Sequence, residues 1–258
     1  MAHRTLIGGT GYTVTGGTDL IDGTARSRTA GRTLVDGTAY AIGFGGLDAA
    51  FSKNSWRTII AACQNKQVPD TWNVGDSCMM AFGKKNYQID IIGKNHDDYA
   101  DGSGKAPLTF QMHTTYATQY KMNGAEYNNC GWKNCLVRTS NAFPALKKVM
   151  PAEVVAALKA VTKKTTAGGA SSAIDTTEDT LFLLSEIEVQ GTRTHSYAGE
   201  GTQYTYYQTA ANRKKNRAWY LRSPRISSTS CFCRTGWSGE ADWSVASEVD
   251  GIAAAWCF

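Results

Sequence analysis

Residues 219–258 read WYLRSPRISSTSCFCRTGWSGEADWSVASEVDGIAAAWCF, a stretch with an apolar run at each end. The runs at 219–224 and 251–258 are short and bounded by turn residues, which is typical of buried strands. Between them, residues 225–250 mix charged, aromatic and small polar side chains without a clean period. Two framework strands around a chemically mixed insert are how a rigid scaffold builds a binding surface. We therefore interpret residues 218–258 as a candidate binding segment with its framework strands.

The candidate ligand-binding residues lie within 225–250. Tryptophan and arginine dominate binding hot spots, so we expect Trp237, Trp243 and Arg234 to be the anchors. Carboxylates in such a surface set electrostatic specificity more than affinity. The full candidate set is Arg225, Ile226, Ser228, Arg234, Trp237, Glu240, Asp242, Trp243, Ser244, Ser247, Glu248 and Asp250.

Length and composition indicate a folded protein without a nucleic-acid or membrane signature. The 258 residues can form one large domain, or one domain with a short appendage. The net charge of +5 is mild and its one basic cluster, at 213–217, is interpreted as a solvated loop, so we expect no nucleic-acid partner. The N-terminal residues contain no apolar stretch long enough for a signal peptide or a membrane span. We therefore expect synthesis in a bacterial cytoplasm and no membrane insertion.

Residues 1–46 contain a Gly/Thr-rich repeat in which Leu6, Leu20 and Leu34 recur every fourteen residues. The repeat predicts three short strands with turns between the copies. Its apolar content is too low for it to be stable alone, so we expect it to pack on other copies or on a larger assembly. A flexible leader is the alternative.

From Leu47 onward the pattern is that of an α+β domain with a mostly antiparallel sheet and two to three helices. The apolar spacing of Trp56, Ile59, Ile60 and Cys63 predicts a helix capped by Asn54 or Ser55. Further strands are predicted at 74–80, 87–92, 108–112 and 181–184, and further helices at 141–148 and 152–162.

Two groups of residues suggest chemistry without completing a catalytic site. Asp97, Asp98 and Asp101 lie in an oxygen-rich loop, so calcium is one interpretation. Their spacing does not match an EF-hand, and Asp-Gly-Ser-Gly is equally a self-bonding turn, so we favour the turn and expect no metal and no cofactor. Glu186 and Glu188 flank Ile187 in an apolar run, where one is expected to be buried and hydrogen-bonded. No nucleophile motif accompanies the four histidines, so we do not expect an enzyme.

The seven cysteines are an odd number and are expected to be reduced, because there is no export signal. Cys231 and Cys233 alternate and would share one face of a strand. Together with Cys257 they could form a redox or metal site, but free cysteine is commonly buried, so packing is favoured.

Six long motifs together resemble one known family. They are WNVGD at 72–76, IIGKNHD at 91–97, ADGSG at 100–104, LFLLSEIEV at 181–189, GEGTQY at 199–204 and WYLRSP at 219–224. The chain resembles, over about residues 50–258, the C-type-lectin-like domain of phage and bacterial proteins, which is distantly similar to formylglycine-generating enzymes. The resemblance implies a compact α+β domain over 47–258 whose last strands and loops form an exposed binding face.

Members of that family often serve as variable proteins of diversity-generating retroelements, in which reverse transcription rewrites adenine positions near the 3′ end of the gene. The resemblance places the diversified region between about Arg225 and Asp250. Arginine, isoleucine, serine, threonine, aspartate, valine and cysteine can all be reached from an asparagine codon by changing adenines. Other template codons are required for Trp237, Trp243, Glu240 and Glu248. The last strand reads Ala254-Ala255-Trp256 where the family usually has Pro-Gly-Phe.

The resemblance implies a non-enzymatic receptor-binding protein of a phage tail that binds a host surface protein or glycan. Residues 1–46 would join other tail or baseplate proteins in the virion, in a homo-oligomer for which a trimer is expected. One alternative is an oxidase resembling formylglycine-generating enzymes that uses Cys231, Cys233 or Cys257 with a metal. The other is a purely structural tail protein.

Overall fold

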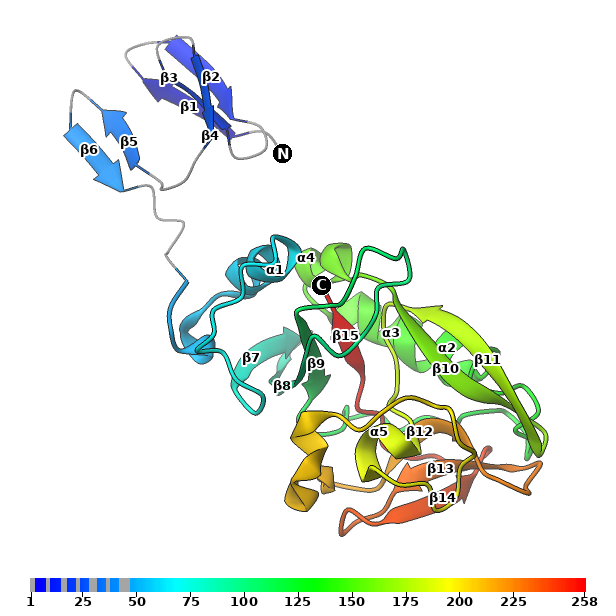
Figure 1. Cartoon of the computed structure of the whole chain (residues 1–258). Helices are drawn as coiled ribbons and strands as arrows, with labels where there is room; N and C mark the ends of the chain where they lie inside the picture. Colours follow the sequence, from blue (N-terminus) through cyan, green and yellow to red (C-terminus); the bar gives the residue numbers. More distant parts are fainter. Residues whose placement is uncertain are drawn as a thin grey trace. The chain divides into compact units, whose positions relative to one another are not determined.

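The computed structural model describes residues 47–258 throughout and, within the first 46 residues, only the backbone of six strands. The chain divides into two compact units, Met1–Asp48 and Ala49–Phe258 (Figure 1). The side chains of residues 1–46, which we expect to contact tail or baseplate proteins, lie outside the described residues.

The strands of the first unit form three antiparallel hairpins, one for each copy of the repeat. One strand per copy was expected, and that expectation is wrong. Each copy forms two strands because β-favouring residues resume after only two intervening residues. The strands are β1 (His3–Ile7), β2 (Thr10–Val14), β3 (Thr18–Ile21), β4 (Thr24–Ser27), β5 (Arg32–Val35) and β6 (Thr38–Ala41). The repeated leucines occupy equivalent registers, in the pairs Leu6 with Gly11, Leu20 with Ala25 and Leu34 with Ala39.

A four-stranded antiparallel sheet forms the centre of the second unit. Its order is β15 (Ala255–Cys257), β9 (Leu108–Met112), β8 (Lys85–Lys94) and β7 (Ser77–Phe82). The strands predicted at 87–92 and 108–112 are confirmed. The strand predicted at 74–80 begins later because the preceding residues turn: the Asp76 carboxylate accepts a 2.8 Å hydrogen bond from the Asn73 amide, and Gly75 has a φ of +99°.

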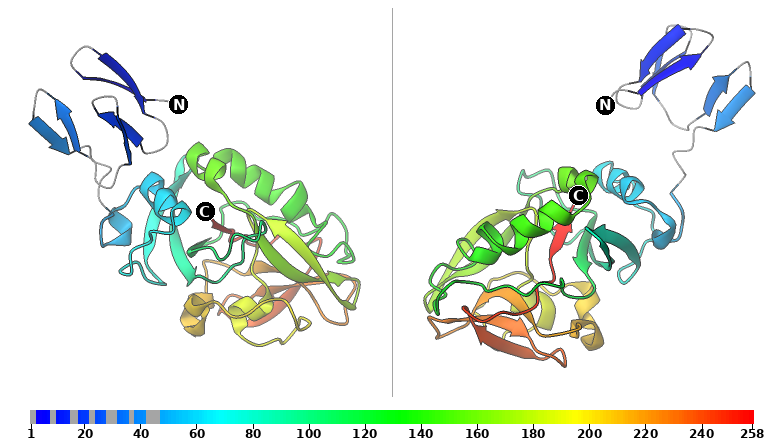
Figure 2. Two further views of the ribbon diagram at one scale, coloured as in Figure 1. Left: turned by 45° about the horizontal axis from the view of Figure 1, so that its top comes forward. Right: turned by 180° about the vertical axis from the view of Figure 1, so that it is seen from behind.

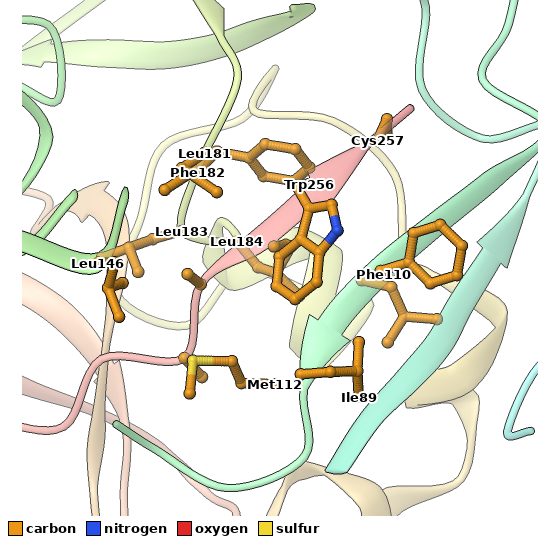
Figure 3. Packing of buried hydrophobic residues seen from close by; sticks show 14 of the residues in the cluster. Ile89, Phe110, Met112, Leu146, Leu181, Phe182, Leu183, Leu184, Trp256 and Cys257 are labelled. Atoms are coloured by element: carbon orange, nitrogen blue, oxygen red, sulfur yellow. The ribbon is translucent and has the colours of Figure 1, made fainter. Parts of the chain in front are cut away.

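The last strand is buried deeply in this sheet. Trp256 pairs with Phe110 across the ladder, and their ring centroids are 6.4 Å apart. On its other side, β15 makes bridges to Phe182 and Lys159. Figure 3 shows Trp256 surrounded by side chains of β8, β9 and the 181–184 segment. Residues 251–258 are all buried, but only 255–257 form the strand predicted across the whole run.

Short helices complete the second unit. Ser55 caps the predicted first helix, its hydroxyl accepting from the Thr58 amide, and helices α1 and α4 contact each other (Figure 2). No helix of the described residues is long and apolar enough to cross a bilayer. The helices are α1 (Trp56–Gln64), α2 (Leu136–Thr139), α3 (Ala142–Val149), α4 (Ala152–Ala157) and α5 (Glu186–Gln190), with 3₁₀ helices at Phe51–Lys53, Thr205–Gln208 and Ala210–Arg213.

Two predicted elements differ in the structure. The helix expected over 152–162 ends at Ala157, because the β-branched residues that follow form β10 (Val161–Gly168), which pairs with β11 (Ser171–Asp179). The segment 181–184 is buried but is not a strand, and only Phe182 makes a bridge. Its four apolar residues are all part of the core. A continuous buried run of this length has the same sequence pattern as a buried strand, so periodicity alone cannot distinguish the two.

A three-stranded antiparallel sheet carries the candidate binding segment. Its order is β12 (Trp219–Pro224), β13 (Cys231–Thr235) and β14 (Ala241–Val245), and it lies with α5 in the lower part of Figure 1. The first of these strands has the predicted bounds. The second unit is therefore α+β with mostly antiparallel sheets, as predicted.

Candidate functional site

The loop 225–230, between β12 and β13, is held from beneath by Asn128. This asparagine is fully buried, and its amide nitrogen donates to the carbonyls of Ser228 at 3.0 Å and Cys231 at 2.7 Å. Its backbone N–H donates to the carbonyl of Thr229 at 2.7 Å. All three acceptors are main-chain atoms, so the loop is held independently of its side chains.

The β10–β11 hairpin supports Asn128 in turn. The Asn128 side-chain oxygen accepts from the Gly169 amide at 2.9 Å. Gly168 has a φ of +82°, and a Cβ at this position would lie 1.9 Å from the carbonyl oxygen of Asn128. Only glycine allows this close approach of two backbones.

Strand alternation distributes the candidate residues over both faces of the β12–β13–β14 sheet. Trp243 pairs with Cys233, whereas Asp242 pairs with Arg234 and Ser244 with Phe232. Consecutive residues of a strand point to opposite faces, so Trp243 lies on one face and Arg234 on the other. The three predicted anchors therefore do not form one contact patch.

The guanidinium of Arg234 is already paired within the protein. Its Nε donates to Asp242 at 2.7 Å, and one terminal nitrogen donates to Asp250 at 2.9 Å. Burial lowers the pKa of Arg234, but these two carboxylates outweigh burial and raise it above its ordinary value. We therefore interpret Arg234 as a clamp between β13, β14 and the chain that follows, rather than as a free anchor.

The turn between β13 and β14 presents the most exposed aromatic residue of the insert (residues 225–250). The side chain of Trp237 is 67% exposed, and that of Trp243 is 37% exposed. Glu240 stabilises the turn, because its carboxylate accepts from the amide and the hydroxyl of Ser238 at 2.9 and 2.5 Å. A rigid turn that carries an exposed tryptophan can contact a ligand at low entropic cost.

The candidate residues fall into three classes of exposure. Ser244 and Asp250 face the interior and do not belong to the contact surface. Trp237, Glu240, Trp243 and Glu248 are exposed, Arg225, Ile226, Ser228, Arg234, Asp242 and Ser247 are half-buried, and Ser244 and Asp250 are buried.

A family model described as a domain of unknown function, DUF6273, matches residues 108–257, which is more than half of the chain. The chain belongs to the DUF6273 family. The DUF6273 segment starts at β9, ends in β15 and contains the whole insert together with α5 and the β10–β11 hairpin. No curated protein and no solved structure matches the chain.

A buried ionic cluster joins Glu188, Arg222 and Lys163 of the DUF6273 segment to Asp97, which precedes that segment. Arg222 of β12 donates to both oxygens of Glu188, at 2.5 and 2.9 Å, and Lys163 of β10 lies 3.3 Å from the same carboxylate. Lys163 also donates to Asp97, as does the hydroxyl of Tyr204. Burial raises the pKa values of Glu188 and Asp97, but the neighbouring cations outweigh burial and lower both. The cluster is closed to solvent and therefore has a structural role.

The three carboxylates proposed as calcium ligands do not converge. Asp97 is buried and paired with Lys163, whereas Asp98 pairs with Lys105 at 3.0 Å and Asp101 with Lys159 at 3.0 Å. Within residues 47–258, no group of three or more His, Cys, Asp or Glu side chains is arranged to hold a metal ion. The structure gives the calcium interpretation no support in this loop.

The cysteines of the proposed oxidase site lie in two different sheets. Cys231 and Cys233 are in β13, whereas Cys257 is in β15 beside Thr109 and Asp97. Burial raises the pKa values of Cys233 and Cys257 well above the ordinary thiol value. A reactive cysteine requires the opposite shift and access to solvent, so packing explains these thiols better.

Glu186 is a buried residue of the DUF6273 segment that shapes the surface indirectly. The pattern predicted one buried glutamate of two, and both Glu186 and Glu188 are buried. The Glu186 carboxylate accepts from the amides of Thr194, His195 and Ser196 at 2.8–3.0 Å. The carbonyl of His195 then accepts from the Ile226 amide at 2.6 Å. Glu186 therefore holds the 194–196 loop against loop 225–230. This role could not be predicted from the sequence, because it depends on contacts between distant segments.

Proposed function

We propose that this DUF6273 protein is a non-enzymatic recognition protein that binds a host surface ligand through residues 225–250. The observation that carries the proposal is the exposure of Trp237 and Trp243 on the β13–β14 hairpin. The backbone of this hairpin accepts hydrogen bonds from the side chains of Asn128, at Cys231, and Gln190, at Gly239. Large apolar side chains at such positions cost solubility and mark interaction sites. The thiols of Cys231, Cys233 and Cys257 are buried and the ionic cluster is closed to solvent, so neither supports catalysis as well as the insert supports binding.

The arrangement of the last strands supports a C-type-lectin-like fold. In that family the last strands and loops form the binding face, and here the insert lies between β12 and the buried strand β15. Main-chain contacts from Asn128 leave the side chains of the loop free to vary. Both features suit the variable protein of a diversity-generating retroelement. A near-copy of the 3′ end of the gene that differs at adenines, beside a reverse-transcriptase gene, is the expected finding in the flanking DNA, and its absence would count against diversification.

The first unit suits attachment to a phage tail. Each of its sheets has two strands, and isolated two-stranded sheets are at best marginally stable in water. We propose that residues 1–46 pack on equivalent hairpins of other copies, in a trimer, or on tail and baseplate proteins.

The test of the binding surface uses the full chain with Trp237→Ala and Trp243→Ala combined. Adsorption of the labelled protein to a panel of bacterial cells should fall at least about tenfold, while the melting temperature changes by no more than about 2 °C. Met79→Ala is the matched control, because Met79 is also an exposed apolar residue, at 55%, but lies in β7. Unfolding of the double variant would show that the tryptophans are structural. Unchanged adsorption by a folded double variant would overturn the proposed surface.

A further inference from the structure

Arg225 is a half-buried cation without a polar partner among residues 47–258. Its guanidinium carbon lies 4.1 Å from the centroid of the Trp243 ring, so the planar cation rests on the aromatic side chain. Within the described part of the chain, its side chain makes no hydrogen bond and no ion pair, and its Nε is buried without a partner. By contrast, the guanidinium of Arg234 is ion-paired with two carboxylates, those of Asp242 and Asp250.

An unpaired guanidinium in this position indicates a missing anion. Partial burial removes water from the charged group, and the aromatic ring replaces only part of that solvation. Two carboxylates of this part of the fold are bound by other groups: Glu186 accepts hydrogen bonds from three backbone amides, and Asp242 accepts from Arg234. Guanidinium groups bind carboxylates through two parallel N–H···O bonds, which a planar cation held on a ring can offer without further ordering.

The side chains around Arg225 and Trp243 favour a sugar as the carrier of that carboxylate. The loop that follows Arg225 consists largely of hydroxyl residues, Ser227, Ser228, Thr229 and Ser230, which are exposed or half-buried. Cores of protein interfaces are depleted in serine and form continuous apolar patches. Isolated aromatic rings among hydroxyl groups match the alternating C–H faces and hydroxyl edges of a pyranose ring.

We infer that Arg225 and Trp243 form the anchor for a sugar carboxylate of an acidic surface polysaccharide. This inference rests on the proposed function and names the ligand class of the same surface. Arg225 would bind the carboxylate, and the free part of the Trp243 ring would contact the sugar.

The test measures binding of the full chain to immobilised alginate, polygalacturonate, hyaluronate and polysialate, each beside its carboxyl-reduced form. At least one polymer should bind, and its carboxyl-reduced form should bind at least about tenfold more weakly. Arg225→Lys should lose a similar factor because lysine lacks the planar fork, and Arg225→Ala should abolish binding. Lys214→Ala is the control for net charge, since Lys214 is exposed and lies outside the insert.

A stability readout separates recognition from a structural role. Arg225→Ala should leave the melting temperature unchanged, whereas Arg234→Ala should lower it, because only Arg234 has ion-pair partners. Absence of binding to all four polymers, equal binding of the carboxyl-reduced forms, or equal Arg225-dependent binding of polyglutamate would each overturn the inference. In all three cases, tryptophan-dependent adsorption to cells would still show that the proposed function stands.

Discussion

Asn128 donates a 2.7 Å hydrogen bond to the carbonyl of Cys231, a residue 103 positions later in the chain. Through this bond and its neighbours, a residue outside the insert determines the backbone path of loop 225–230. Because the acceptors are carbonyl groups, the contact survives changes of side chain in the loop. A surface built in this way can change its chemistry while its geometry stays fixed.

Replacing Asn128 with alanine should destabilise the second unit and disorder loop 225–230. The change removes the side-chain donor of the Ser228 carbonyl and the side-chain acceptor of the Gly169 amide, while the Cys231 carbonyl keeps the Arg225 amide. A buried polar group left without a partner costs about 1–3 kcal/mol. We expect a loss of about 2–4 kcal/mol of unfolding free energy and a fall in melting temperature of several degrees. Thermal unfolding and amide hydrogen exchange at 225–231 measure the two effects. Asn129→Ala, at the exposed neighbouring position, should be close to neutral. Similar melting temperatures for the two variants would contradict the role of Asn128.

Glu188→Gln should be among the most destabilising conservative changes in the chain. It removes the carboxylate that is ion-paired with Arg222 and leaves Lys163 paired with Asp97 alone, and breaking a buried pair costs about 3–5 kcal/mol. Glu178→Gln, at an exposed position of β11, is the control. Denaturant unfolding should separate the two variants clearly, and equal midpoints would show that the cluster contributes little. The lowered pKa values of Glu188 and Asp97 also predict that this stability is present above the ordinary carboxyl range and is lost as pH falls.

Lys215 should make stability rise with pH above neutrality. Burial lowers the pKa of this lysine to about 7, and its ammonium donates to the carbonyls of Met112 and His113 at 2.8 and 2.9 Å. Between pH 7 and the ordinary lysine value, the unfolded chain binds the proton that the folded chain has lost. The unfolding free energy should therefore rise with pH, by at most about 1.4 kcal/mol per unit from this group.

Comparison with Lys215→Met isolates that contribution, because methionine fills similar space without a titrating group. Urea unfolding at about pH 6.5, 7.5 and 8.5 should show the unfolding free energy of the wild type rising relative to that of the variant. Ionisation of the cysteines affects both proteins equally and cancels in the comparison. Lys214→Met, at the exposed neighbouring position, should follow the wild-type profile. Parallel profiles for the wild type and Lys215→Met would contradict the lowered pKa.

Sequence patterns predicted most of the strands of the second unit, but not the conformation of the segments that lie between its regular elements. The strand at 219–224 was predictable because its apolar run is short and bounded by turn residues, and the strand at 108–112 because apolar and polar residues alternate in it. The segment 181–184 has the same local appearance but fills space between layers, and only tertiary context distinguishes the two. Residues 158–162 follow a helix in sequence, yet they leave it because of distant partners: Lys159 makes a bridge to Cys257 of β15, and residues 161–162 pair with β11.

The location of the insert was predictable from composition, whereas the roles of its residues were not. Nothing in the sequence distinguishes Arg225 from Arg234 as a candidate. In the structure, Arg234 is paired with Asp242 and Asp250, whereas Arg225 lies on the ring of Trp243. That difference depends on strand register, which places alternate residues on opposite faces. The structural role of Asn128 could not be predicted from the sequence, because an asparagine in a loop is common and its role depends on hydrogen-bond partners that are distant in the chain.

The burial of the C-terminal strand has a genetic consequence. Every residue from Gly251 to Phe258 is buried, and these residues are encoded downstream of the whole insert. A frame-shifting insertion or deletion in the codons for 225–250 would replace or remove β15 and deprive β9 of one of its two ladder partners. Only copies that keep the reading frame can therefore fold, so the architecture acts as a proofreading filter on any process that rewrites this part of the gene.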